Sequence, residues 1–131
     1  MSPDPLAFLR AVATEPWALC RSDCLGVVVR WLVLCGHERA AGLLPDVEPT
    51  DEAVGAWLAD AGGLEVVMRR GAETLGLATA DEPIPGDVAY LEFGAGNETA
   101  AIWLGRGWGF RTRGGLGVIR SGRAREMVWG V

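Results

Sequence analysis

The segment from Cys24 to Cys35 constrains the fold more than any other part of the chain. Its sequence, CLGVVVRWLVLC, would be apolar on nearly every side of a helix, because Arg30 is its only charged residue. Ser22 or Asp23 is placed to cap the start of this helix, and Gly36 to end it. A helix that is apolar all round is a buried one. Its twelve residues are well short of the ~20 that cross a bilayer, so we expect the central helix of a folded domain and no membrane span.

The pattern of the remaining segments changes near Ala80. Before it, runs of helical length are separated by glycine and proline; after it, short runs rich in valine, isoleucine, tryptophan and phenylalanine are separated by glycine. This order predicts one α+β domain over residues 1–131, with a helical part over about 1–80 and a sheet part over about 81–131. The expected helices cover residues 4–15, 22–36, 50–62 and 64–75, with Asp4 and Thr50 as caps, and the expected antiparallel strands cover residues 87–93, 99–105, 108–112, 117–120 and 127–131.

The charge of the chain is acidic but uneven. The formal net charge is −5, every cationic side chain is an arginine and lysine does not occur, which argues against a general nucleic-acid binder. Six arginines and a single acidic residue, Glu126, lie from Arg106 onward. This imbalance predicts either charge compensation within one domain or a basic docking surface for a partner.

The first residues, MSPDPLAFLR, lack the basic and apolar regions of a signal peptide, which favours a protein that is cytoplasmic when it is made.

The position of Cys24 raises the question of whether its thiol is a nucleophile, a metal ligand or a small hydrophobic group. The first turn of a helix favours the thiolate, so position alone predicts a somewhat activated cysteine. A cysteine hydrolase also needs a histidine, and the only one, His37, lies thirteen residues farther on, ~20 Å away along an intact helix. Cys35 is too distant to share a metal ion with Cys24, and Cys20 with Cys24 alone makes a poor site. We therefore expect no metal, no cofactor and no disulfide framework, with Cys35 in the core.

Three stretches of the sequence form a set: PWALCRSDCLGVVVRWLVLCG, then IPGDVAYLEF, then TAAIWLGRGWGFRTRGGLGVI. In this order and spacing they resemble the NlpC-type cell-wall peptidases, papain-like enzymes with an Asp-Cys pair at the head of a central helix. The resemblance covers residues 16–131 and implies a papain-like α+β fold. The resemblance places Cys24 at the position of the family's nucleophile, and Asp23 at the position just before the nucleophile. The family's histidine falls at Thr99 or within one residue of it, and the family's third polar residue falls near Arg111.

These matches imply a degenerate active site. A hydroxyl has no suitable pKa and a guanidinium does not give up its proton, so neither Thr99 nor Arg111 can act as the base for a thiol. Within the superfamily, the sequence is similar to a branch of small proteins encoded beside tail genes in phages and prophages. The resemblance therefore implies a virion protein of the phage tail, assembled in the host cytoplasm, that binds other tail proteins at the hub or tail tip and retains at most a contact with peptidoglycan.

Two alternatives of different classes stay open. One is an active cysteine hydrolase that cleaves peptidoglycan with Cys24 as nucleophile, taking its base from another chain or from His37 if the central helix breaks early. The other is a soluble immunity or regulatory protein with no role in a tail. Asp87 precedes a strand in the turn IPGD and is more simply a turn residue than a catalytic one.

The six tryptophans indicate either a glycan-stacking groove or a packed core with an interface. Trp31, Trp57 and Trp103 lie in apolar patterns and are expected in the core. Trp108 and Trp129 lie near glycine and arginine and are the better candidates for exposed contacts. Together with the basic charge of this part, they predict docking on an acidic surface of another tail protein. The expected contacts lie within residues 106–131, with Trp108, Arg111 and Arg113 the main ones.

Overall fold

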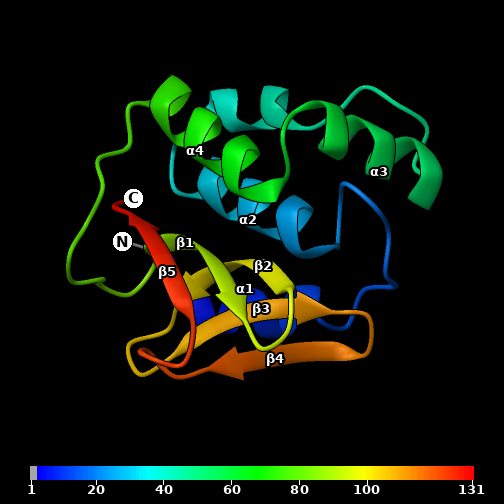
Figure 1. Ribbon diagram of the computed structural model, residues 1–131. Helices are drawn as coiled ribbons and strands as arrows, with labels where there is room; N and C mark the ends of the chain where they lie inside the picture. The colour runs from blue at the N-terminus through cyan, green and yellow to red at the C-terminus, as the bar shows by residue number, and fades with distance from the viewer. Residues whose placement is uncertain (1–2) are drawn as a thin grey trace.

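The structure is a computed structural model that describes residues 3–131. Within these residues, the chain forms five helices and a five-stranded antiparallel sheet (Figure 1), so the predicted α+β class is confirmed. The last helix ends at Leu75 and the first strand begins at Val88. The helices are α1 (Pro5–Val12), α2 (Cys24–Leu34), the 3-10 helix η1 (Glu38–Leu43), α3 (Asp51–Asp60) and α4 (Leu64–Leu75); the strands are β1 (Val88–Phe93), β2 (Asn97–Trp103), β3 (Trp108–Thr112), β4 (Gly115–Ile119) and β5 (Arg125–Trp129).

The predicted helix caps are confirmed. The Asp4 carboxylate accepts a hydrogen bond from the backbone of Leu6 at 3.0 Å, and the Thr50 hydroxyl accepts one from the backbone of Ala53 at 3.1 Å. Gly76 ends α4 with a φ of 72°, in the left-handed region that favours glycine. The sequence did not indicate η1, because a six-residue 3-10 helix is too short to show a helical period.

The central helix is α2, as predicted. It lies on β2 and β3, with α1 and η1 packed against its other sides (Figure 1). The indole Nε1 of Trp31 on this helix donates a hydrogen bond to the backbone oxygen of Gly86 at 2.7 Å, which connects the helix to the loop before β1. None of the helices in the described part of the chain is both long and apolar enough to cross a membrane. The residues of α2 buried in the main core are Val27, Val28, Val29, Trp31 and Leu32.

Four strands of the sheet form an antiparallel meander, and the fifth strand joins it from a more distant part of the sequence. β1 to β4 follow one another, and β5 returns to the free side of β1, which gives the order β4-β3-β2-β1-β5. β4 begins at Gly115 and β5 at Arg125, each two residues earlier than predicted. These residues extend the ladders, because Gly115 pairs with Thr112 and Arg125 with Glu92.

The sheet is strongly curled. The indole Nε1 of Trp108 on β3 donates a hydrogen bond of 2.8 Å to the carboxylate of Glu126 on β5, although β2 and β1 lie between these strands in the sheet order. Adjacent strands are ~4.8 Å apart, so a flat sheet could not bring β3 and β5 together. The curl encloses a second hydrophobic core, opposite the face that packs on α2, formed by Ala89, Leu91, Ala101, Trp108 and Val128.

Candidate functional site

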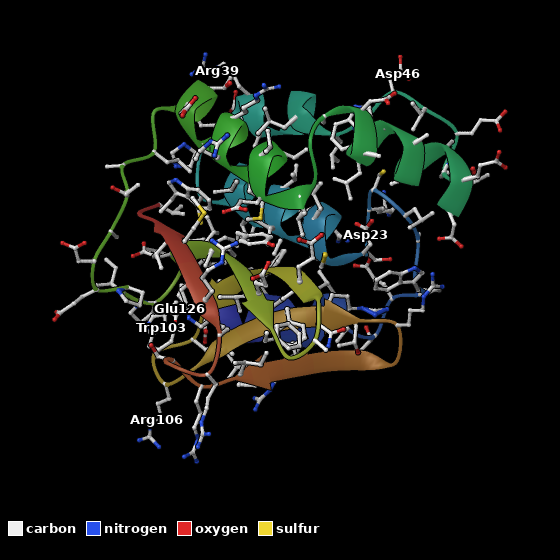
Figure 2. All side chains as sticks on the ribbon, in the orientation of Figure 1. Asp23, Arg39, Asp46, Trp103, Arg106 and Glu126 are labelled. Atoms are coloured by element: carbon white, nitrogen blue, oxygen red, sulfur yellow. The ribbon has the colours of Figure 1, made fainter. Side chains whose placement is uncertain are left out.

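The start of α2 is held by a network of side chains from the preceding turn. Asp23 caps the helix: one carboxylate oxygen accepts a hydrogen bond from the backbone of Gly26 at 2.8 Å, and the other accepts one from the backbone of Cys20 at 3.0 Å. Figure 2 shows Asp23 at this end of the helix. The Ser22 hydroxyl donates to the backbone oxygen of Pro16 at 2.6 Å and accepts from the backbone of Ala18 at 2.7 Å. Both carboxylate oxygens of Asp23 are engaged in positioning the turn, which fixes Cys24 as the first helical residue.

The thiol of Cys24 lies against the start of β2. Burial raises its pKa above the ordinary value for a thiol, and the negative charge of Asp23 acts in the same direction. Hydrogen bonding to the backbone of Ala100 and to the hydroxyl of Thr99 lowers the pKa, but burial prevails. This partial burial opposes the activation that the helix start alone predicts for Cys24.

The register of the sheet explains why Cys24 meets this part of β2. β2 pairs with β3 through Ile102 and Trp103 among the described residues, so Thr99 and Ala100 extend beyond the paired region on that side. The Thr99 side chain is itself buried, and its hydroxyl also donates to the backbone oxygen of Ala100 at 2.9 Å. The structure thus brings together Cys24 and Thr99, the two positions that the sequence analysis singled out for a nucleophile and its absent base.

Arg111 is not part of this contact. Its guanidinium donates hydrogen bonds to the backbone oxygens of Glu15 at 2.6 Å and Thr112 at 3.0 Å, and it lies 5.7 Å from the centre of the Trp17 ring. The residue is only 4% exposed. No hydrogen bond in residues 3–131 joins it to Cys24 or Thr99. Arg111 therefore anchors β3 to the loop before α2 and has no direct effect on the thiol.

A cleft of about 220 Å³ opens beside Cys24. Glu98, one residue before Thr99, lies at its polar end and accepts a hydrogen bond from the hydroxyl of Tyr90 at 2.5 Å. α3 contributes apolar side chains to the wall of the cleft but has no fully buried residue. Trp57 on this helix is half-buried, so the expectation that it belongs to the core is wrong. Glu98 could not be singled out from the sequence, because its role depends on Tyr90 in a neighbouring strand. The apolar lining consists of Leu25, Pro45, Val54, Trp57, Leu58 and Leu64.

The other titratable candidates lie away from Cys24. His37 lies just before η1, beyond the far end of an unbroken α2, and its side chain makes no capping hydrogen bond. Cys20 lines the same cleft as Cys24, whereas Cys35 packs against the main core, as expected. Asp87 accepts hydrogen bonds from the backbones of Ile84 at 2.9 Å and Val131 at 3.1 Å, which confirms it as a turn residue. Over the described part of the chain, no group of three histidine, cysteine or acidic residues is arranged to hold a metal ion.

The expected docking residues need correction. Trp108 is 0% exposed, because the curl of the sheet folds it into the second core. Trp129 is also buried, because it lies under α2 and α4 in the main core. Arg111 is buried as well, so only Arg113 of the expected contacts is exposed. Arg113 stacks over Trp17 at 5.1 Å and makes a 3.4 Å ion pair with Asp51.

Comparison with models of protein families, with curated proteins and with solved structures finds no match for this chain.

The protonation of Cys24 gives a direct prediction. In a Cys20→Ser/Cys35→Ser variant, alkylation of Cys24 by iodoacetamide at pH 7.5 should be about tenfold or more slower in the folded protein than in the same protein unfolded in urea. The thiol titrates higher in the folded state, so the native rate should continue to rise above the pH at which the unfolded rate has levelled off. Mass spectrometry of time points measures both rates. Faster alkylation of the folded protein would contradict the proton-retaining environment described above.

Proposed function

We propose that the protein is a catalytically inactive NlpC-type domain that serves as a binding module in a phage tail. The observation that carries this proposal is the contact of Cys24 with Thr99. A thiol at the head of a central helix faces an antiparallel strand, as in a peptidase of this type, but the side chain beside it is a hydroxyl. A hydroxyl accepts no proton from a thiol near neutral pH, so the nucleophile is not activated.

The arrangement of the elements supports the papain-like part of the proposal. The helix that begins with Cys24 packs on an antiparallel sheet that follows it in the sequence, and the strand opposite the thiol is the second of that sheet. A cleft with an apolar wall remains beside the thiol. A scaffold that keeps the cleft while its cysteine stays protonated is suited to binding and not to hydrolysis.

The alternative of an active hydrolase using His37 receives no support from the geometry. That alternative needs the central helix to break early, and α2 is continuous to Leu34. His37 follows the end of α2 and begins η1 on the side of the molecule away from the sheet. The location in a phage tail rests on the resemblance to proteins encoded beside tail genes.

The proposal predicts that Cys24 is dispensable. The purified protein should release no soluble fragments from peptidoglycan, because Cys24 has no base. In a phage or prophage that lacks the gene, a copy carrying Cys24→Ala should restore the infectious titre as well as the wild-type copy does, and both proteins should be found in purified tails by mass spectrometry. An active NlpC-type peptidase serves as the positive control for hydrolysis.

Two results would contradict the proposal. Clearing of a cell-wall zymogram by the wild type but not by Cys24→Ala would establish a peptidase. Absence of the protein from purified tails, with titre unaffected by loss of the gene, would remove the tail assignment and favour the regulatory alternative.

A further inference from the structure

The two edges of the sheet differ in how they are covered. On the outer side of β5, the backbone of Ala80 donates to Val128 at 3.0 Å and the backbone of Gly130 donates to Ala78 at 2.8 Å, so the segment before β1 shields this edge. β4 has no such cover. Within residues 3–131, no hydrogen bond from outside β3 reaches residues 115–119, and Figure 1 shows β4 as the outermost strand, with no segment beyond it. In an antiparallel ladder about half of the peptide groups of an edge strand point outward and have no partner.

β4 also lacks the features by which edge strands normally avoid pairing. Such strands carry charged side chains, proline or bulges, whereas β4 reads GLGVI and pairs with β3 in continuous register. Val118 is 59% exposed. Gly117 is required by the packing beneath it, because a Cβ there would lie 2.6 Å from the Phe110 ring. The result is a bare main chain with one exposed apolar side chain.

The charge around β4 indicates what can pair with it. Arg106, Arg120 and Arg123 are exposed at one end of the strand, and no ion pair within the described residues involves them. Figure 2 shows Arg106 extending from this side of the molecule. Glu126, the only acidic residue of the C-terminal part, is half-buried, and its carboxylate oxygens are already engaged: one accepts from Trp108 and the other from the backbone of Gly122 at 2.9 Å. At the other end, Arg113 pairs with Asp51 in a highly exposed contact, which leaves most of its charge available to a partner.

We propose that the outer edge of β4 receives an extended acidic segment of a partner protein, which adds to the sheet as a further strand. The main-chain ladder supplies affinity, Val118 contacts an apolar side chain of the added strand, and the arginines at both ends of β4 select carboxylates. Pairing of β4 with β4 of a second copy is disfavoured, because in either strand direction it would place exposed arginines of one copy beside exposed arginines of the other. This inference deepens the proposed binding function and rests on it only for the view that the partner is a tail protein.

The test uses the full chain labelled with ¹⁵N and a seven-residue peptide in which glutamate and valine alternate, capped at both ends. The amide chemical shifts that change most on titration should be those of residues 115–119. The affinity for the peptide should fall about tenfold between 50 and 300 mM salt. The same peptide with alternate amides N-methylated, and a peptide with lysine in place of glutamate, should each bind at least about fivefold more weakly.

Matched variants separate the surface from general effects. Val118→Asp and Arg120→Glu/Arg123→Glu should each lower the affinity for the glutamate–valine peptide about fivefold or more, whereas Ile84→Asp, at an apolar residue that is 67% exposed elsewhere, should leave it unchanged. Shifts centred outside β4, equal binding of the N-methylated peptide, or a dimer of the free chain that Val118→Asp dissociates would each overturn the inference. These results would leave the proposed function standing, because peptidoglycan hydrolysis and incorporation into tails are measured separately.

Discussion

Replacing Trp108 by alanine should lower the free energy of unfolding by about 3–5 kcal/mol, a large part of the total stability of a domain of this size. The side chain is 0% exposed and packs edge-on against Trp103 with ring centres 5.0 Å apart. Its loss leaves a cavity in the second core, and it leaves Glu126 without the indole donor that joins β3 to β5. Both effects act on the same small core.

Urea denaturation followed by circular dichroism measures this effect. Trp108→Phe keeps most of the ring but loses the hydrogen bond, so it should fall between wild type and Trp108→Ala. Trp57→Ala is the matched control, because Trp57 lies half-buried on α3 and should cost much less. A Trp108→Ala protein within about 1 kcal/mol of wild type would show that the second core contributes little to stability.

Replacing Arg111 by glutamate should also destabilise the protein by about 3–5 kcal/mol. The guanidinium is buried and donates hydrogen bonds to two backbone oxygens, those of Glu15 and Thr112. A carboxylate in its place would face the same oxygens with no proton to donate, so a buried charge would lose its partners. A failure of Arg111→Glu to bind a partner would therefore report unfolding and not a lost contact.

The comparison with Arg113→Glu isolates the effect of burial. Arg113 is two residues away on the same chain segment, but its side chain is 68% exposed and its pair with Asp51 is a surface contact, so the cost should be at most about 1 kcal/mol. Arg111→Met removes the donors without adding a charge and should be less harmful than Arg111→Glu. Equal thermal unfolding of Arg111→Glu and Arg113→Glu would contradict the anchoring role of Arg111.

The helices could be predicted closely because their signals are local. Asp4, Asp23 and Thr50 cap helices through bonds that span two or three residues, so each cap is visible in the sequence beside the helix it starts. The all-round apolar character of α2 likewise required a central position whatever surrounded it.

The surroundings of the tryptophans and of the thiol could not be predicted in this way. Trp108 lies between glycines, a context that is equally compatible with an exposed turn and with a tightly curled strand. Its burial depends on Glu126, eighteen residues farther along. The state of Cys24 has a similar origin: the helix start is local, but burial in the folded structure raises the pKa of the thiol, and the strand that contacts the thiol, β2, lies far along the chain. Thr99 was identified as its neighbour only through the resemblance to a known family.

The position of β5 in the sheet sets an order of events during synthesis. β1 lies between β2 and β5, and its partner residues in β5 are more than thirty positions away, so β1 leaves the ribosome long before one of its two edges can pair. Until residues 125–129 appear, the second core has no wall on that side and Trp108 has no acceptor for its indole proton. A released chain that ends before Arg125 would thus hold its helices and a four-stranded meander with an open, apolar edge, which is the state most prone to pair with another chain.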